Sequence, residues 1–210
     1  VSYGNSVAPD KFTIDMTIPV ISVSYDNNNA QNGNYFKETR TATVTITEHN
    51  FESSRMQLTM SAADNANAAS APSVSSWSDS GDTHTATISF AQDAVYTWTM
   101  AYTDKAGNKA ADLESQNFCI DLTKPSVSIS GITPGSANSS QGNIGFAVEC
   151  TDTNFDTFTP VLSAVVYENG KFVKKTVEGN VTSIGNGQRV EYGNLEEDGM
   201  YSFTCSASDK

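Results

Sequence analysis

Six acidic residues occupy matching positions in two similar halves of the chain, and carboxylates brought together in this way can bind a cation. They are Asp15, Glu48 and Asp104 in the first half and Asp121, Asp152 and Asp209 in the second half. Ca²⁺ prefers such oxygen ligands, so each set is a candidate calcium site. Calcium usually takes six or more oxygens, however, and no dense Asp/Asn loop is present. The alternative stays open that each carboxylate accepts backbone N–H bonds from its own turn.

A second candidate for chemistry is a pair of cysteines, Cys150 and Cys205, which replace Ile46 and Met100 of the first half. Both fall on predicted strands that face each other across a sandwich core. A disulfide between them would stabilise the second half by roughly 3 kcal/mol. The alternative is two buried thiols that pack as small hydrophobic groups.

No motif points to catalysis. Asp79-Ser80-Gly81 has the sequence of the aspartic-protease triplet, but that chemistry needs two carboxylates that share a proton, and the triplet occurs once. The two histidines, His49 and His84, have no nucleophile or metal partner at motif level. We therefore expect a protein that is not an enzyme.

A predicted hairpin offers a candidate binding surface. Asn169-Gly170 lies between two strand-like runs, which is a strong signal for a tight turn. Around it the chain places Tyr167, Lys171, Lys174 and Lys175. This is a local basic patch on an acidic protein and a candidate binding surface, although a solvated hairpin without a partner is the default interpretation.

The overall charge excludes several classes of partner. The formal net charge is −12, with 24 acidic and 12 basic residues. Such a surface repels nucleic acids and anionic lipids. No apolar run approaches the roughly 20 residues of a membrane span. We expect no nucleic-acid binding and no membrane insertion.

Three phrases recur and reveal the elements that would position these residues. The pairs are "FTIDMTIPVISVS" (12–24) with "FCIDLTKPSVSIS" (118–130), "VTITEHNF" (44–51) with "VECTDTNF" (148–155), and "DAVYTWTMAYTDK" (93–105) with "DGMYSFTCSASDK" (198–210). The near-constant spacing indicates two copies of one building unit. Each "TIP" or "TKP" marks a short joint in which proline blocks helix.

The units are predicted to be all-β. Apolar residues alternate with polar ones in 83–90, in 94–102 and in 201–207, which is typical of antiparallel strands with one buried face. Several short strands in a unit of this length favour a sandwich of two sheets. We predict tandem antiparallel β-sandwiches joined end to end by the proline-containing joints.

The repeat also predicts the domain boundaries. Residues 1–17 correspond to the last strand of a preceding unit, residues 18–121 to a complete unit, and residues 122–210 to a second unit without its final strand. The chain is therefore expected to be a fragment of a longer protein. A sandwich without its last strand has an open sheet edge. We hypothesise that the spare strand at 5–17 fills this edge in a neighbouring molecule.

The phrases "YTDKAGN" (102–108), "DAVYTWTM" (93–100), "TATVTITEHNF" (41–51) and the Ile-Asp-x-Thr-x-Pro joints resemble bacterial immunoglobulin-like (Big-type) repeats of Gram-positive surface proteins. The resemblance covers nearly the whole chain, although the second unit ends before Ala-Gly-Asn. It implies immunoglobulin-like sandwiches, an extracellular position on the bacterial cell surface and no catalysis.

The resemblance leaves two functions open. One is a secreted module that binds a host protein, by adhesion or by superantigen-like capture, with immunoglobulin as the first candidate partner. The alternative is a passive stalk that projects another domain from the cell wall. The sequence carries no requirement for a cofactor other than the candidate calcium.

Overall fold

The computed structural model of the chain describes residues 11–63, 69–137 and 144–210. Apart from the short 3-10 segment η1 (Ser53–Arg55), all regular structure in these ranges is β-strand, so the predicted all-β fold class is confirmed. Within the described ranges, no helix has the length and apolar character that a membrane span requires. The predicted strand at 1–17 lies partly outside the described residues, and residues 11–19 form no strand.

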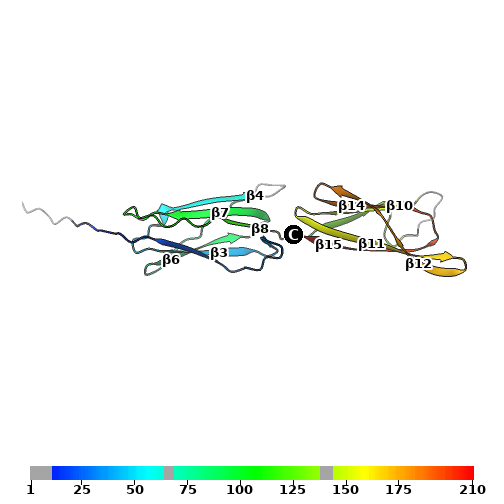
Figure 1. Cartoon of the computed structure of the whole chain (residues 1–210), viewed down its shortest axis with the longest axis horizontal. Coiled ribbons are helices and arrows are strands. Elements are labelled where there is room, and N and C mark those ends of the chain that lie inside the picture. The colour runs from blue at the N-terminus through cyan, green and yellow to red at the C-terminus, as the bar shows by residue number, and fades with distance from the viewer. Residues whose placement is uncertain (1–10, 64–68, 138–143) are drawn as a thin grey trace, which may run out of the picture. The chain divides into compact units, whose positions relative to one another are not determined.

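The chain divides into two compact units, with the boundary between their main parts at Ile120 and Asp121. Figure 1 shows that strands form two layers within each unit. Strand pairing is antiparallel in both units, as the alternating apolar pattern predicts.

Unit 1 contains two sheets. The first sheet has, in spatial order, β1 (Val20–Tyr25), β3 (Arg40–Thr47), β6 (Thr83–Phe90) and β5 (Ser78–Ser80). The second has, side by side, β8 (Gln116–Ile120), β7 (Ala94–Tyr102) and β4 (Met56–Ala63). Alternate residues of β3, β6 and β7 are buried, because one face of each strand faces the other sheet. The ring of Phe90 on β6 lies 4.9 Å from the rings of both Tyr96 and Phe118, so aromatic contacts join the two sheets.

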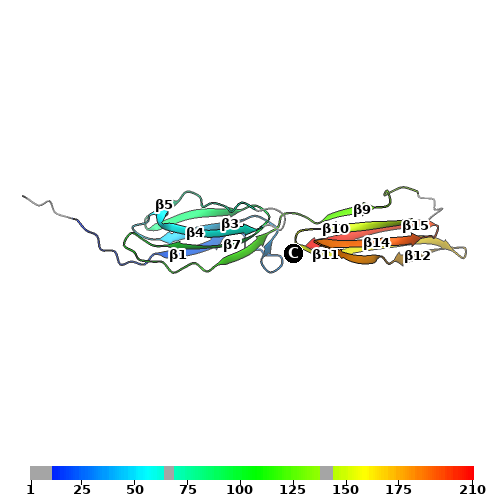
Figure 2. The same ribbon diagram turned by 90° about the horizontal axis from the view of Figure 1, so that it is seen from above.

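Unit 2 also contains two sheets. The first has β13 (Asn180–Ile184), β14 (Gly187–Leu195), β10 (Ile144–Thr151) and β9 (Ser126–Ser130). The second has β12 (Lys171–Val177), β11 (Phe155–Glu168) and β15 (Gly199–Asp209), and Figure 2 shows both sheets from a second side. The ring of Phe146 on β10 stacks on Tyr192 and meets Phe203 of β15 edge-on, at 5.0 and 6.1 Å. The core of unit 2 therefore also lies between its two sheets.

The equivalent strands β7 and β15 differ in their neighbours. β7 lies between β4 and β8, whereas β15 pairs only with β11 and forms the edge of its sheet among the described residues. Tyr201 and Phe203 of β15 are half-buried, and Cys205 and Ala207 are exposed. The alternation in 201–207 therefore predicts the strand correctly, but the buried face that it suggests is wrong for the last two residues. Among the described residues, no second neighbouring strand covers β15 there.

The predicted hairpin forms between β11 and β12, with Glu168 opposite Lys171. Asn169 and Gly170 both have positive φ angles, of 49° and 80°. A two-residue turn of this kind requires positive φ at both positions, which asparagine and glycine tolerate best. The sequence signal for this turn is thus confirmed.

Candidate metal centre

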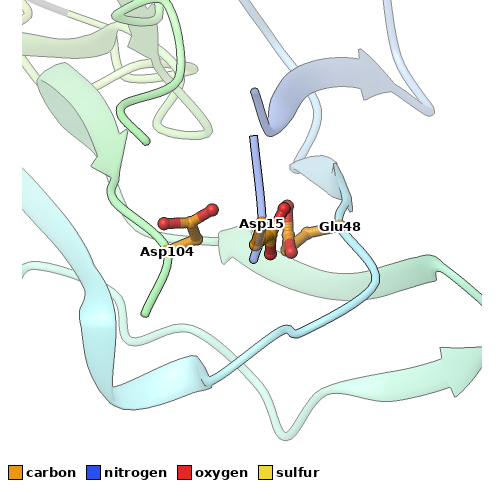
Figure 3. A group of neighbouring side chains, drawn as sticks. All are labelled: Asp15, Glu48 and Asp104. Atoms are coloured by element: carbon orange, nitrogen blue, oxygen red, sulfur yellow. The ribbon is translucent and has the colours of Figure 1, made fainter. Parts of the chain in front are cut away.

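Three carboxylates from distant parts of unit 1 meet at one end of its sheets. Asp15 belongs to the extended segment 11–19, Glu48 follows β3, and Asp104 follows β7. Each residue offers a carboxylate oxygen, and these oxygens lie within 4.8 Å of one another. Figure 3 shows the three side chains converging from three separate segments. These are the three residues that the sequence repeat places together in the first half.

Asp15 is held by hydrogen bonds to the body of unit 1. Its Oδ2 accepts a hydrogen bond from the side chain of Asn50 at 2.8 Å, and its Oδ1 accepts one from the backbone N–H of Thr17 at 3.0 Å. The side chain of Asn108 donates to the backbone carbonyl of Asp15 at 3.1 Å. Together with Pro19, which is buried, these bonds fix the segment that enters the unit.

Asp104 is completely buried and is surrounded by donors from its own turn. Its Oδ1 accepts the backbone N–H of Asn108, and its Oδ2 accepts the side chain of Asn108, both at 2.8 Å. Burial alone raises the pKa of Asp104, but the hydrogen bonds from Asn108 and from the backbone of Gly107 outweigh this effect. The pKa of Asp104 is therefore lower than its ordinary value, and the group is a buried anion at neutral pH.

Glu48 is also buried, with 1% of its surface exposed. Its Oε1 accepts the backbone N–H of Asn50 at 2.8 Å, but its Oε2 has no hydrogen-bond partner. The backbone of Glu48 is fixed on both sides, because its N–H donates to the carbonyl of Asp82 and its own carbonyl accepts from Nε2 of His84 at 2.7 Å. The second ring nitrogen of His84, Nδ1, contacts the carboxylate of Asp79. His84 therefore connects Asp79 to the backbone carbonyl of Glu48, and not to the carboxylate of Glu48.

Unit 2 repeats the arrangement with Asp121, Asp152 and Asp209, whose ligand oxygens also lie within 4.8 Å of one another. Asn154 donates from its side chain to Oδ2 of Asp121 at 2.8 Å and from its backbone to Oδ1 of Asp152 at 2.7 Å. Burial raises the pKa of Asp121 against the hydrogen bond from Asn154, and the negative charge of Asp152 raises it further. The pKa of Asp121 therefore shifts in the opposite direction to that of Asp104.

Sequence reasoning missed the asparagines that organise both clusters. Asn50 and Asn154 occupy the same place in the repeated phrases "TEHNF" and "TDTNF", and this repetition is the signal that could have identified them. Asn108 belongs to the phrase "KAGN", which resembles a family motif, but nothing in the phrase indicates that its side chain reaches Asp15. The carboxylates alone do not reveal which neutral donors hold them.

The predicted disulfide is not formed in the structure. Cys150 and Cys205 are both free thiols, Cys150 buried on β10 and Cys205 exposed on β15. Burial raises the pKa of the Cys150 thiol above its ordinary value. The negative charge of a nearby Cys205 thiolate raises this pKa further. The exposure of Cys205 follows from its position on the edge strand, where the second neighbour that β7 has in unit 1 is not present among the described residues.

The hairpin residues do not form one uniform basic patch. Tyr167, Lys171 and Lys174 are exposed, but Lys175 is half-buried between Glu168 and Glu197. The Nζ of Lys175 lies 2.8 Å from Oε1 of Glu197. The hydrogen bonds to both carboxylates raise the pKa of Lys175, so this lysine is a structural cation within the unit. Phe172, which the sequence analysis did not select, is 79% exposed and lies opposite Tyr167.

The chemistry available at the carboxylate clusters is cation binding. Among the described residues, the groups that hydrogen-bond to these carboxylates are amides and backbone N–H groups. Comparison of the chain with protein-family models and with curated proteins finds no match.

Proposed function

We propose that the chain is a non-catalytic, immunoglobulin-like repeat module of a bacterial surface protein and that it binds a host protein. The resemblance of its repeated phrases to Big-type repeats supports this assignment, as do the two-layered units and the short joints that contain Pro19 and Pro125. Immunoglobulin is the first candidate partner. An extracellular position on the cell surface follows from the same resemblance.

The observation that carries the binding function is an exposed aromatic pair on the β11–β12 hairpin. Tyr167 and Phe172 lie opposite each other on one face of the hairpin, with ring centroids 5.2 Å apart. They are 61% and 79% exposed. Aromatic residues are enriched at the centres of protein interfaces, because they bury much area at a small cost in conformational entropy. An aromatic pair that remains in water is a natural contact for another protein.

The flanking charges favour a particular kind of contact. Lys171 and Lys174 are exposed on the same hairpin, while the chain as a whole is strongly acidic. A partner surface that combines an apolar centre with a few carboxylates would complement the tip of this hairpin. The negative charge of the rest of the module would repel the same carboxylates. The lysines would then act mainly on the rate of association and on orientation.

Surface plasmon resonance against pooled human immunoglobulin, with a panel of other host glycoproteins, tests the proposal. We expect saturable binding by the chain and a loss of at least about tenfold in affinity for Phe172→Ser, because truncating a central aromatic typically costs more than 1 kcal/mol. Val181→Ser is the matched control, since Val181 is 60% exposed on β13 in the other sheet. Equal loss in both variants would contradict the hairpin as the contact.

A second candidate function is that of a passive stalk, and one observation favours it. The segment that enters unit 1 is fixed to the unit by the hydrogen bonds from Asn50 and Asn108 to Asp15. Such bonds restrict bending at the joint, which a projecting stalk requires. The absence of binding to every protein on the panel would favour the stalk over the binding module.

A further inference from the structure

The carboxylate of Glu48 has an unusual environment for a buried acid. Its Oε2 is removed from solvent and has no hydrogen-bond partner, although buried polar atoms nearly always have one. Leaving a charged group in this state is costly. Because the same side chain supplies its ligand oxygen to the cluster with Asp15 and Asp104, the unsatisfied carboxylate belongs to the place where the three acids meet.

The donors around the cluster are all electrically neutral. Of its six carboxylate oxygens, five accept hydrogen bonds from backbone or amide N–H groups of Thr17, Asn50 and Asn108, and the backbone of Gly107 also donates to Asp104. The sixth is Oε2 of Glu48. Neutral donors stabilise each anion separately, but they do not cancel the repulsion among three negative charges.

In the part of the chain that the structure describes, no basic side chain is paired with the cluster. Over the ranges 11–63, 69–137 and 144–210, no lysine, arginine or histidine forms an ion pair with Asp15, Glu48 or Asp104. Arg55 pairs with Glu52 and donates to the backbone carbonyl of Asp104. His49 pairs with Asp82, although the charges of Asp15 and Glu48 also contribute to its raised pKa. A cation from outside the chain would supply the positive charge that no ion pair provides in the described part of the chain.

We propose that Asp15, Glu48 and Asp104 bind a calcium ion at the end of unit 1. The oxygens of the cluster lie within 4.8 Å of one another, which is no farther apart than two ligands on opposite sides of a Ca²⁺ ion that each lie about 2.4 Å from it. Mg²⁺ needs a tighter octahedron, with ligands at about 2.0–2.1 Å. Asp15 is half-exposed, so water can complete the coordination from that side.

The proposal concerns unit 1, and it does not depend on the proposed binding of a host protein. The cluster of unit 2 has the same type of residues, but none of its oxygens is an unpartnered buried atom among the described residues. The ion would tie the entering segment, the end of β3 and the end of β7 to one point. It would thereby strengthen the attachment that Asn50 and Asn108 already make to Asp15.

Isothermal titration calorimetry and thermal unfolding of the 210-residue chain, in calcium and in chelator, test the site. We expect binding in the range of about 0.1–1 mM, which is typical of extracellular calcium modules, and a higher unfolding midpoint with calcium because the ion binds only the folded state. Mg²⁺ should give a clearly smaller effect. The absence of a calcium-dependent shift, or an equal shift with Mg²⁺, would contradict the assignment.

Matched variants separate the site from general charge effects. Glu48→Gln should abolish the calcium-dependent shift, and in chelator it should be at least as stable as the original chain, because it removes an unsatisfied buried charge. Glu52→Gln is the control, because this substitution removes the same charge from the same loop. The side chain of Glu52 forms ion pairs with Arg55 and Lys105 and is not part of the cluster.

Asp15→Asn provides the same test if Glu48→Gln does not fold, because Asp15 is less buried. Asp209→Asn, in the cluster of unit 2, should leave the calcium-dependent shift of unit 1 unchanged. Retention of the shift in Glu48→Gln, or its loss in Glu52→Gln or Asp209→Asn, would overturn the proposal.

Discussion

The side chain of Asn108 donates a hydrogen bond to the backbone carbonyl of Asp15, 3.1 Å away and 93 residues earlier in the chain. The same amide group donates to the carboxylate of Asp104 at 2.8 Å. A single asparagine therefore connects the segment that enters unit 1 to the turn that follows β7. This connection uses a neutral side chain, so it holds the two segments together whether or not an ion is bound.

Replacing Asn108 by alanine should destabilise unit 1 by about 2 kcal/mol, because one of the two lost bonds goes to an ionised and buried carboxylate. Chemical denaturation in the presence of chelator measures this effect without a contribution from calcium. Lys109→Ala is the matched control, since the neighbouring Lys109 makes only an exposed ion pair with Asp112. A stability equal to that of the control would show that the Asn108 bonds contribute nothing.

Gly187 and Gly193 lie on the same strand, β14, and should respond in opposite ways to alanine. A Cβ at Gly187 would collide with the backbone carbonyl of Cys150 and would lie 2.9 Å from the Cα of Thr151, whereas a Cβ at Gly193 meets nothing within 4 Å. We expect Gly187→Ala to destabilise unit 2 by about 3 kcal/mol through overpacking against backbone.

Gly193→Ala should leave the stability of unit 2 within about 1 kcal/mol of the original value, or raise it slightly by restricting the unfolded chain. Urea denaturation of both variants gives the comparison. Equal stabilities would mean that β10 and β14 can separate locally without cost, contrary to the pairing of Thr151 with Gly187.

The unpaired edge of β15 leads to a prediction on self-association. Phe12 and Ile14 match Phe118 and Ile120, which are buried on β8 beside β7, but Phe12 and Ile14 are themselves 84% and 73% exposed. We propose that the segment with Phe12 and Ile14 in one molecule pairs with β15 of another, as β8 pairs with β7. Sedimentation velocity should then show a mass that rises with protein concentration.

Ile14→Asp should weaken this association, because it places a charge on the face that would enter the core of unit 2. Thr17→Asp is the control, since Thr17 follows the matched strand residues. A monomer mass at all concentrations would exclude strand exchange, as would equal association by both variants.

Burial is predicted best from the sequence in strands where every second side chain faces a core. Ile46, Ile88 and Trp98 are buried as their alternation indicates, because period two is a property of the strand itself. Burial also depends on neighbouring strands, which the alternation does not encode. For this reason the same pattern in 201–207 fails at Cys205, and the disulfide inferred from that pattern is not formed.

The candidate metal site also combines features that the sequence predicts with features that depend on the three-dimensional neighbours of a residue. An immunoglobulin-like topology predicts that Asp15, Glu48 and Asp104 meet, because the entering joint and the loops after the two strands share one end of such a sandwich. Their oxygens do lie within 4.8 Å of one another. The unpartnered Oε2 of Glu48 has no sequence signal, since it depends on which neighbours fail to reach a buried atom. The exposed Phe172 was missed for a related reason, because an apolar residue in a strand is ordinarily expected to be buried.

The distance along the chain between the parts of the Asp15 cluster also bears on the speed of folding and unfolding. The contact between Asn108 and Asp15 encloses almost the whole of unit 1, and contacts between residues so far apart in sequence tend to form late. Interactions that form after the transition state slow unfolding and leave the folding rate nearly unchanged. A cation held by Asp15, Glu48 and Asp104 would therefore lengthen the lifetime of the folded unit without helping the chain to find its fold.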